Sequence, residues 1–98
     1  MIVMKIYTTS QEVLLAACDE NILGKEFREG NIHIYVDPNF YGDMRVSDEV
    51  FLNSMKIATI ANLVGEYVVN LAIRGGFINP ECVIRIAGVP HAQMARMW

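Results

Sequence analysis

The stretch SDEVFLNSMKIATIANLVGEYVVNLAIR, residues 47–74, holds the strongest pattern in the sequence and decides the fold that we predict. Ser47 can cap a helix, and Asp48 and Glu49 follow it where the helix dipole favours carboxylates. Polar residues then recur every three or four positions, which places them in one stripe along a helix. These residues are Asn53, Lys56, Thr59, Asn62, Glu66, Asn70 and Arg74. We therefore expect a helix that is buried on most sides and stops at Gly75-Gly76.

The predicted helix is too long to stay straight within this chain. Residues 48–74 would extend about 40 Å at roughly 1.5 Å per residue, whereas a domain of ~100 residues has a radius of gyration of about 13 Å. Gly65, preceded by Asn62 as a second candidate cap, predicts a kink or a break. The apolar part of the helix is short for a membrane span and contains Glu66, so we expect no membrane segment.

Segments before this helix have the composition of strands and turns. Residues 2–8 and 12–18 are β-rich runs that would pair as a hairpin. Asp19 can cap a single helical turn that Gly24 closes in the left-handed conformation. Residues 32–36 alternate apolar and polar side chains, as a strand with one buried face does.

Residues 83–87, after the helix, form a further candidate strand. The sequence thus predicts one α+β domain over residues 1–98. We expect a small three- to four-stranded, mainly antiparallel sheet, covered on one face by a long, kinked or broken helix. For residues 94–98 the pattern does not distinguish a last strand from a helical turn.

The composition indicates a chain that needs a partner. Its 98 residues suffice for one domain whose core requires no disulfide. Hydrophobic residues make up 53% of the chain and charged residues 19%, which is more apolar surface than one small core hides. A second copy of the chain is the simplest partner, so we expect a homo-oligomer.

The charges argue against tight binding to nucleic acid. The chain has 8 Lys and Arg against 11 Asp and Glu, for a net charge of -3, and the cations never form a run. Sequence-independent binding requires several cations that neutralise phosphates together. We expect no strong nonspecific nucleic-acid binding, while a local RNA contact stays open.

Neither the cysteines nor the N-terminus indicates an oxidising compartment. Cys18 and Cys82 form neither a zinc pattern nor a disulfide framework, and with His33 and His91 they would hold a metal only if the fold happened to gather them. Cys18 precedes two carboxylates, which disfavour a thiolate nucleophile. The stretch MIVMKIYTT lacks the features of a signal peptide. We expect a cytoplasmic protein with no metal and no cofactor.

The segment GVPHAQ, residues 88–93, gathers polar residues within an apolar region. Pro90 fixes the backbone, so we interpret the segment as a rigid turn that aims His91 and Gln93 at a binding surface. His91 could also act as a general acid or base, since histidine titrates near neutral pH. The structural alternative is a histidine that is satisfied by the backbone and closes a turn over the core.

Two other groups could complete a site. Phe40 and Tyr41 lie in the loop segment DPNFYGDMRVSD, and loop aromatics serve both as lids on a core and as anchors at interfaces. Asn62 and Glu66 belong to the polar stripe. Asparagine is a poor helix former, which suggests that Asn62 makes hydrogen bonds of its own, although a solvated helix face is the alternative.

Four blocks of the sequence, taken together, resemble one family. They are CDENILGKEF, DPNFYG, IANLVGEYVV and VIRIAGVPHAQ, within residues 13–93. In this order they are similar to the archaeal family catalogued as domain of unknown function 424. The resemblance implies a small stand-alone domain of an archaeal cytosol, in a setting of translation and RNA metabolism, and it implies no particular activity.

Two functions are compatible with these residues. The first is a non-enzymatic binding or adaptor domain that engages a protein or ribonucleoprotein partner of the translation machinery. Its binding residues would be His91, Gln93, Pro90, Asn62, Glu66, Phe40 and Tyr41. The second is a small enzyme in which His91 is the general acid or base and Glu66 orients it within a closed pocket. The acidic charge, the apolar excess and the lack of a catalytic motif favour the first.

Overall fold

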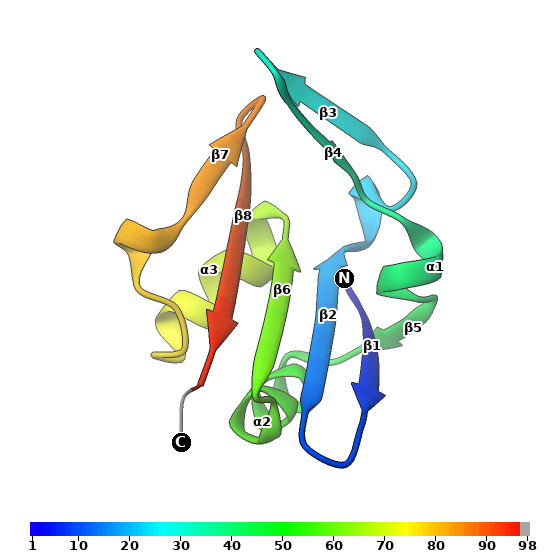
Figure 1. The fold of residues 1–98 in the computed structure, drawn as a ribbon, viewed down its shortest axis with the longest axis vertical. Coiled ribbons are helices and arrows are strands. Elements are labelled where there is room, and N and C mark those ends of the chain that lie inside the picture. The colour runs from blue at the N-terminus through cyan, green and yellow to red at the C-terminus, as the bar shows by residue number, and fades with distance from the viewer. Residues whose placement is uncertain (97–98) are drawn as a thin grey trace.

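The dominant feature of the computed structural model, which describes residues 1–96, is a six-stranded sheet flanked by short helices (Figure 1). The elements in chain order are β1 (Ile2–Thr8), β2 (Val13–Asp19), the 3-10 turn η1 (Glu20–Ile22), β3 (Glu26–Glu29), β4 (Ile32–Tyr35), α1 (Pro38–Tyr41), β5 (Met44–Val46), α2 (Asp48–Ile57), β6 (Ile60–Val64), α3 (Glu66–Arg74), the 3-10 turn η2 (Pro80–Cys82), β7 (Ile84–Ile86) and β8 (Val89–Ala95).

The large sheet is mixed. Its strand order is β5-β1-β2-β6-β8-β7, and the neighbours β2 and β6 run parallel while the other neighbours run antiparallel. Strands β3 and β4 form a separate two-stranded hairpin. The two central strands, β2 and β6, therefore have a hydrogen-bonded neighbour on either side.

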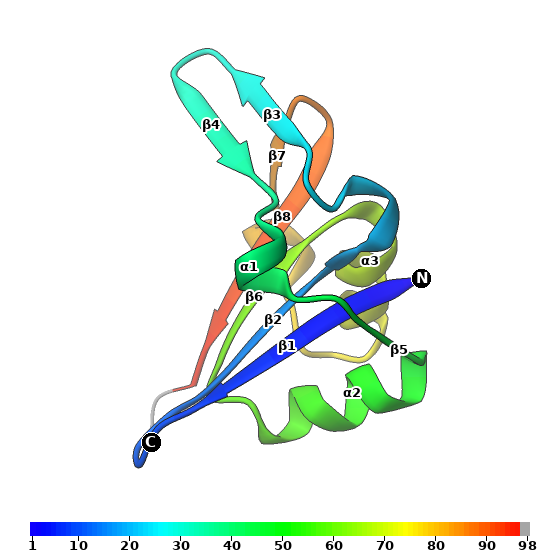
Figure 2. The same cartoon turned by 90° about the vertical axis from the view of Figure 1, so that its right-hand side faces the viewer.

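One face of the large sheet is covered by α2 and α3, which lie together on the same side in Figure 2. We call this the helix-covered face. Leu15 and Leu63 point into it from the central strands, and Phe51 of α2 and Val68 of α3 pack against them with no exposed surface. Alternation along the strands places every second side chain here. This layer is the main hydrophobic core.

The opposite face is covered only in part, by α1 and the β3–β4 hairpin (Figure 2). Cys18 and Val64 point to this side, and Val36 and Tyr41 close over them. The hairpin reaches the β7–β8 turn, where the Ala87 amide donates to a carboxylate oxygen of Glu29 at 2.8 Å. The second core is smaller and leaves part of the sheet surface uncovered.

The prediction of a small sheet under one long helix was wrong. The chain segment 47–74 contains two short helices, α2 and α3, and between them the central strand β6. The sheet has six strands instead of three or four, with a second two-stranded sheet beside it. Within residues 1–96, no helix is long and apolar enough to span a membrane.

The error has a physical reason. A strand that is buried on both faces reads as a continuous apolar run, and such a run matches a buried helix as well as a strand. In the run IANLV of β6, Asn62 happened to continue the spacing set by the exposed residues of α2 and α3. The residues of the polar stripe therefore lie on three separate elements, α2, β6 and α3, apart from Thr59, which is buried between α2 and β6.

Other local predictions were confirmed. β1 and β2 form the expected antiparallel hairpin. The Ser47 hydroxyl accepts from the Val50 amide at the start of α2, as a cap does. Gly76 has a φ of +81° just after α3, in the left-handed region that the Gly-Gly pair was expected to supply. The end of the chain stays strand as far as Ala95, and positions 97 and 98 lie outside the described residues.

The segment GVPHAQ is not a turn as a whole, which corrects our interpretation. Only Ala87 and Gly88 turn, both with positive φ, and strand β8 begins at Val89. Pro90 is tolerated inside the strand because its neighbour does not need the missing N–H. The Gly65 amide donates to the Pro90 carbonyl at 2.9 Å, while the Gly65 carbonyl accepts from Val69 in α3.

Candidate functional site

The uncovered part of the sheet surface carries three of the residues that the sequence marked, and two more, on α1, border it. Asn62 of β6 lies directly opposite Gln93 of β8, and His91 lies two residues earlier on the same side of β8. Tyr7 of β1 and Leu14 of β2 point to the same side. We call this surface, defined by Tyr7, Leu14, Asn62, His91 and Gln93, the open face. It lies on the side of the sheet away from α2 and α3.

Asn62 is the centre of a hydrogen-bond network on the open face. Its side-chain oxygen accepts from the hydroxyl of Tyr41 at 3.1 Å and lies 2.9 Å from Nε2 of His91. Asn62 and His91 are half-buried and Tyr41 is buried. Three elements, α1, β6 and β8, thus meet through one amide oxygen. Such a network holds the side chains in fixed positions, because each bond restricts both partners.

Burial keeps the titratable side chains in and beside this network uncharged. Desolvation lowers the pKa of His91 below its ordinary value of 6.5, because the imidazolium loses more hydration than the neutral ring. Desolvation also raises the pKa of Tyr41, with a smaller contribution from the nearby Cys18. The pKa of the Cys18 thiol rises to about 12 through burial first and the charge of Asp19 second. At neutral pH these groups act as hydrogen-bonding or apolar groups and carry no charge.

Aromatic side chains border one side of the open face. The rings of Tyr7 and Phe40 stack with centroids 5.7 Å apart, and Phe40 meets Tyr41 edge-on at 5.0 Å. The Tyr7 hydroxyl donates to the Phe40 carbonyl at 2.7 Å. α1 holds this loop in place, since the Asp37 side chain caps it by accepting from the Asn39 amide. The two loop aromatics are therefore both a lid on the smaller core and a wall of the open face.

A shallow pocket borders the other side. Its volume is about 230 Å3, and it is lined by Cys82, Ile84, His91 and Gln93. Ile84 belongs to the edge strand β7 and is 53% exposed. Strand β7 pairs with β8 only as far as His91, so Gln93 has no residue of β7 opposite it. Apolar contacts are thus available on both sides of the amide network.

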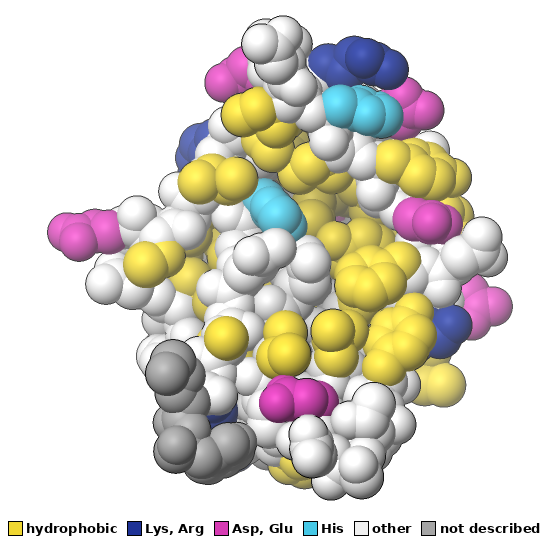
Figure 3. Space-filling view, viewed as in Figure 1, with side chains coloured by type: hydrophobic (Ala, Val, Ile, Leu, Met, Phe, Trp, Pro, Cys, Tyr) yellow, Lys and Arg dark blue, Asp and Glu magenta, His cyan; other side chains and the backbone are white. Residues whose placement is uncertain are grey.

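Figure 3 shows this side of the molecule in space-filling form. Hydrophobic side chains gather across its middle around a histidine, while most acidic and basic side chains lie toward the rim. An uncharged centre with aromatic side chains and a polar rim is the anatomy of a protein interface.

Glu66 and Pro90 do not join the open face. Glu66 begins α3, and its carboxylate accepts from Arg85 at 3.2 Å. Pro90 and Arg85 are cross-strand partners on the helix-covered side, where with Asn70 they line another pocket. Because successive side chains of a strand point to opposite faces, Pro90 faces away from His91. The sequence grouped Glu66 with His91 and Asn62, and the structure does not bring Glu66 to them.

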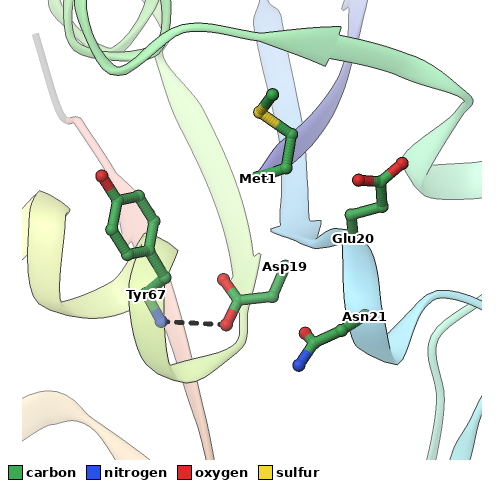
Figure 4. Close-up of a pocket in the computed structure, with 5 residues that line it drawn as sticks. All are labelled: Met1, Asp19, Glu20, Asn21 and Tyr67. Atoms are coloured by element: carbon green, nitrogen blue, oxygen red, sulfur yellow. Dashed lines mark hydrogen bonds between the residues drawn. The ribbon is translucent and has the colours of Figure 1, made fainter.

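Asp19 has a role that the sequence did not predict. Its side chain makes no bond to η1, which it was expected to cap. Instead its two carboxylate oxygens accept from the amides of Tyr67 and Val68 at 2.9 Å each, which caps α3 from the end of the neighbouring strand β2. Figure 4 shows the carboxylate directed at the Tyr67 nitrogen, beside a pocket of about 350 Å3. The Asp19 carboxylate stabilises the helix start, and the other acidic residue of this pocket, Glu20, pairs with Arg45, so both acidic groups are already engaged.

No group of three or more His, Cys, Asp or Glu side chains within residues 1–96 is placed to hold a metal ion. His33 lies on the β3–β4 hairpin with Glu26, 3.0 Å from its Nε2 atom. Cys82 is exposed and Cys18 is buried. Cys82 lies with His91 at the shallow pocket, whereas Cys18 is buried and His33 lies on the hairpin, so the structure does not gather the four residues of the possible metal site.

Comparison with known proteins agrees with the four sequence blocks. The chain matches the model of the family described as "Protein of unknown function (DUF424)" over residues 7–97. The chain belongs to this family. Among solved structures it is similar to the "crystal structure of an uncharacterized conserved protein from Methanopyrus kandleri", with a TM-score of 0.79 and 21% identity over 99% of this chain and 95% of that one. That similarity shows the fold. No match is found among curated proteins.

Sequence reasoning missed three side chains on or beside the open face: Tyr7, Leu14 and Ile84. Tyr7 appeared only as part of a β-rich run, and Ile84 only as part of a strand. The signal for Tyr7 was its position in the alternation of β1, which places it on the same side as Val3 and Lys5. Ile84 had no signal of its own, because its exposure depends on how far β7 extends along β8.

Proposed function

We propose that this protein is a non-enzymatic binding or adaptor domain that engages a protein or ribonucleoprotein partner through its open face. The observation that carries the proposal is the Tyr41–Asn62–His91 network, held at the centre of an uncharged surface. Aromatic residues and amides at the centre of a surface are typical of positions that contribute most to binding. Gln93 and the Phe40–Tyr41 loop complete the surface.

The enzymatic alternative has less support. General acid or base catalysis by His91 would gain from a carboxylate that orients the ring. The partner of the His91 ring is the neutral oxygen of Asn62, and the carboxylate of Glu66 pairs with Arg85 on the other side of the sheet. The lowered pKa of His91 favours a neutral ring that accepts or donates one hydrogen bond. These contacts support a binding role for His91 over a catalytic one.

Photocrosslinking tests the proposal directly. The exposed Gln93 is replaced by p-benzoylphenylalanine in the native host or a close relative, and crosslinked products are compared with and without RNase. The matched control carries the same residue in place of Asn53, which is exposed on α2 on the other side of the sheet. A protein or ribonucleoprotein crosslinked at position 93 and absent from the Asn53 control supports the proposal. Equal products at both positions, or none, contradict it.

Separate substitution of the two histidines tests whether the crosslinked partner binds at the open face. The partner captured at position 93 should be lost when His91→Ala is added and kept when His33→Ala is added, because His33 lies on the hairpin with Glu26. Sensitivity of the product to RNase separates a ribonucleoprotein from a protein partner.

Further expectations, which concern the role, location, source and oligomeric state of the protein, belong to the same proposal. We infer a role in translation and an archaeal source from the family resemblance, and a cytoplasmic location and a homo-oligomeric state from the sequence, and each stays a prediction. The hydrophobic share of 53% supports a second copy as one occupant of an exposed surface. Sedimentation velocity on the purified chain measures the oligomeric state, and a monomer at all concentrations would contradict that part.

A further inference from the structure

The amide network has a defined direction of donation. An amide oxygen can only accept hydrogen bonds, and the Asn62 oxygen contacts both the Tyr41 hydroxyl and Nε2 of His91. Nε2 therefore carries the proton. In a neutral imidazole this leaves the other nitrogen, Nδ1, as a bare acceptor. The network thus fixes which hydrogen-bonding group His91 can offer to a ligand.

The open face also holds unused donors. Among the described residues, the Asn62 side-chain nitrogen and the whole Gln93 amide have no hydrogen-bond partner. Asn62 and Gln93 are direct cross-strand neighbours, so their side chains start about 5 Å apart. The surface therefore presents one acceptor from His91, two donors from Asn62, and both kinds of group from Gln93.

The spacing of these groups matches an extended polypeptide. His91 and Gln93 are two residues apart on one side of β8, a separation of about 6.6 Å. An extended peptide presents an N–H and a C=O on the same side with the same two-residue repeat. An amide N–H suits the His91 acceptor, and a carbonyl suits the amide donors of Asn62 and Gln93.

The charges near the open face and the apolar surfaces on either side of it further restrict which class of ligand can bind there. Lys5 is the cation that β1 presents on this side, and its ammonium group already contacts the Asn39 carbonyl at 3.3 Å and lies over the Tyr7 ring. Phosphates of a nucleic acid would thus find no free cluster of cations here. The stacked Tyr7 and Phe40 rings on one side and Ile84 on the other suit apolar side chains.

We propose that the open face binds an extended, uncharged segment of a partner protein and reads its backbone amides through His91, Asn62 and Gln93. This inference rests on the proposed binding function and names the chemistry of its partner. The peptide backbone supplies the donor for His91 and the carbonyls for the two amides. Apolar side chains of the segment lie against the aromatic wall and Ile84.

The first test measures the tautomer of His91 by long-range 1H–15N correlation on the uniformly labelled protein at neutral pH. The proposal expects a proton on Nε2 and none on Nδ1, with the other histidine, His33, resolved in the same spectrum and assigned by His33→Gln. A proton on Nδ1 would remove the acceptor and overturn the proposal.

The second test uses a phage library of random short peptides selected on the wild-type chain. We expect uncharged, apolar peptides to be enriched. N-methylation of single backbone amides in a synthetic copy should lower affinity about tenfold at one or two positions, the effect of one lost hydrogen bond of about 1.4 kcal/mol. Gln93→Ala should lower affinity several-fold, and this exposed side chain has no folding role that could confuse the result. His33→Ala should leave affinity unchanged.

Other outcomes overturn the proposal. These are no enrichment, peptides bound equally by His91→Ala and wild type, an N-methyl scan without effect, and displacement of the peptide by single-stranded oligouridylate. If crosslinking at position 93 still captures a partner while peptide selection fails, this inference falls and the binding function stands. If both fail, the binding function falls as well.

Discussion

The two faces of the large sheet are formed by the same strands and differ in how completely their side chains are covered and hydrogen-bonded within the chain. On the helix-covered face, Leu15, Leu63, Phe51 and Val68 are fully buried against one another. On the open face, β6 presents Asn62, with an unused amide nitrogen, and β8 presents the exposed Gln93. One face is complete within the chain, and the other keeps both polar and apolar groups available.

The difference shows where stability and function reside in this protein. Burial of apolar surface stabilises a fold without regard to direction, so the helix-covered face needs only shape and hydrophobicity. The amide network uses directional bonds at a surface where a leucine would bury more area. Substitutions should therefore separate the two faces, one by its effect on stability and the other by its effect on binding.

The largest expected effect comes from the helix-covered face. Phe51→Ala removes a fully buried ring and should lower the free energy of unfolding by about 3–5 kcal/mol. Gln93→Ala on the open face should change it by less than about 0.5 kcal/mol. Urea unfolding followed by circular dichroism measures both. A destabilisation by Gln93→Ala comparable to that of Phe51→Ala would show that stability does not reside mainly on the helix-covered face.

The next effect concerns the junction between β6 and α3. Gly65 has a φ of +125°, and a Cβ there would lie 2.4 Å from the Asp19 carboxyl carbon. Gly65→Ala should cost about 2–4 kcal/mol, from backbone strain and the clash together. Gly88→Ala is the matched control, because Gly88 has a φ of +81° and no atom within 4 Å, and it should cost only about 1–2 kcal/mol. Equal losses of stability for the two variants in thermal unfolding would show that the close approach of Asp19 to position 65 does not affect stability.

A smaller effect should follow from loss of the α3 cap. Asp19→Ala removes the acceptor of two helix amides and should destabilise the protein by about 1–2 kcal/mol. Asp37→Ala removes a single bond at the four-residue α1 and should cost about 0.5 kcal/mol. Chemical unfolding at neutral pH compares the pair. A larger loss of stability for Asp37→Ala would mean that α1 with its aromatic residues, and not the cap of α3, limits the stability of the protein.

The smallest effect is a pH dependence that comes from His91. Its pKa is lowered in the folded state by burial, so below pH 6.5 the unfolded chain binds more protons than the folded one. The contribution of His91 to stability is complete above pH 6.5 and falls as the pH decreases toward the folded-state pKa. In His91→Gln, which can still donate to Asn62, this slope should be absent. Identical pH profiles of unfolding for the two proteins would contradict the burial of the ring.

Sequence reasoning found much of the site for partly mistaken reasons. His91, Gln93, Asn62, Phe40 and Tyr41 were all marked as binding residues, and the structure gathers them on or beside the open face. Asn62 was marked because asparagine disfavours a helix, and it lies in a strand. His91 and Gln93 were expected to leave a turn, and they alternate along β8. The residue types were informative even where the predicted element was wrong.

What the sequence could not reveal is which residues share a face. Glu66 and Asn62 are four positions apart, which would place them together on a helix. They lie on different elements, and Glu66 pairs with Arg85 while Asn62 pairs with His91. The parallel pairing of β2 with β6 brings residues 14–18 beside residues 60–64, and no local pattern encodes that contact. Partnerships of this kind depend on strands that are distant along the chain.

Local sequence patterns were sufficient to identify the family, the hairpin of β1 and β2, the cap at Ser47 and the polar residues available for a site. These features depend on residue type and on neighbours within a few positions, where turn and capping chemistry act. The tertiary structure alone decided that residues 60–64 form the central strand and that Asn62 joins Tyr41 to His91. A short apolar run satisfies a helix and a strand equally well, so its conformation is chosen by the strands that pair with it.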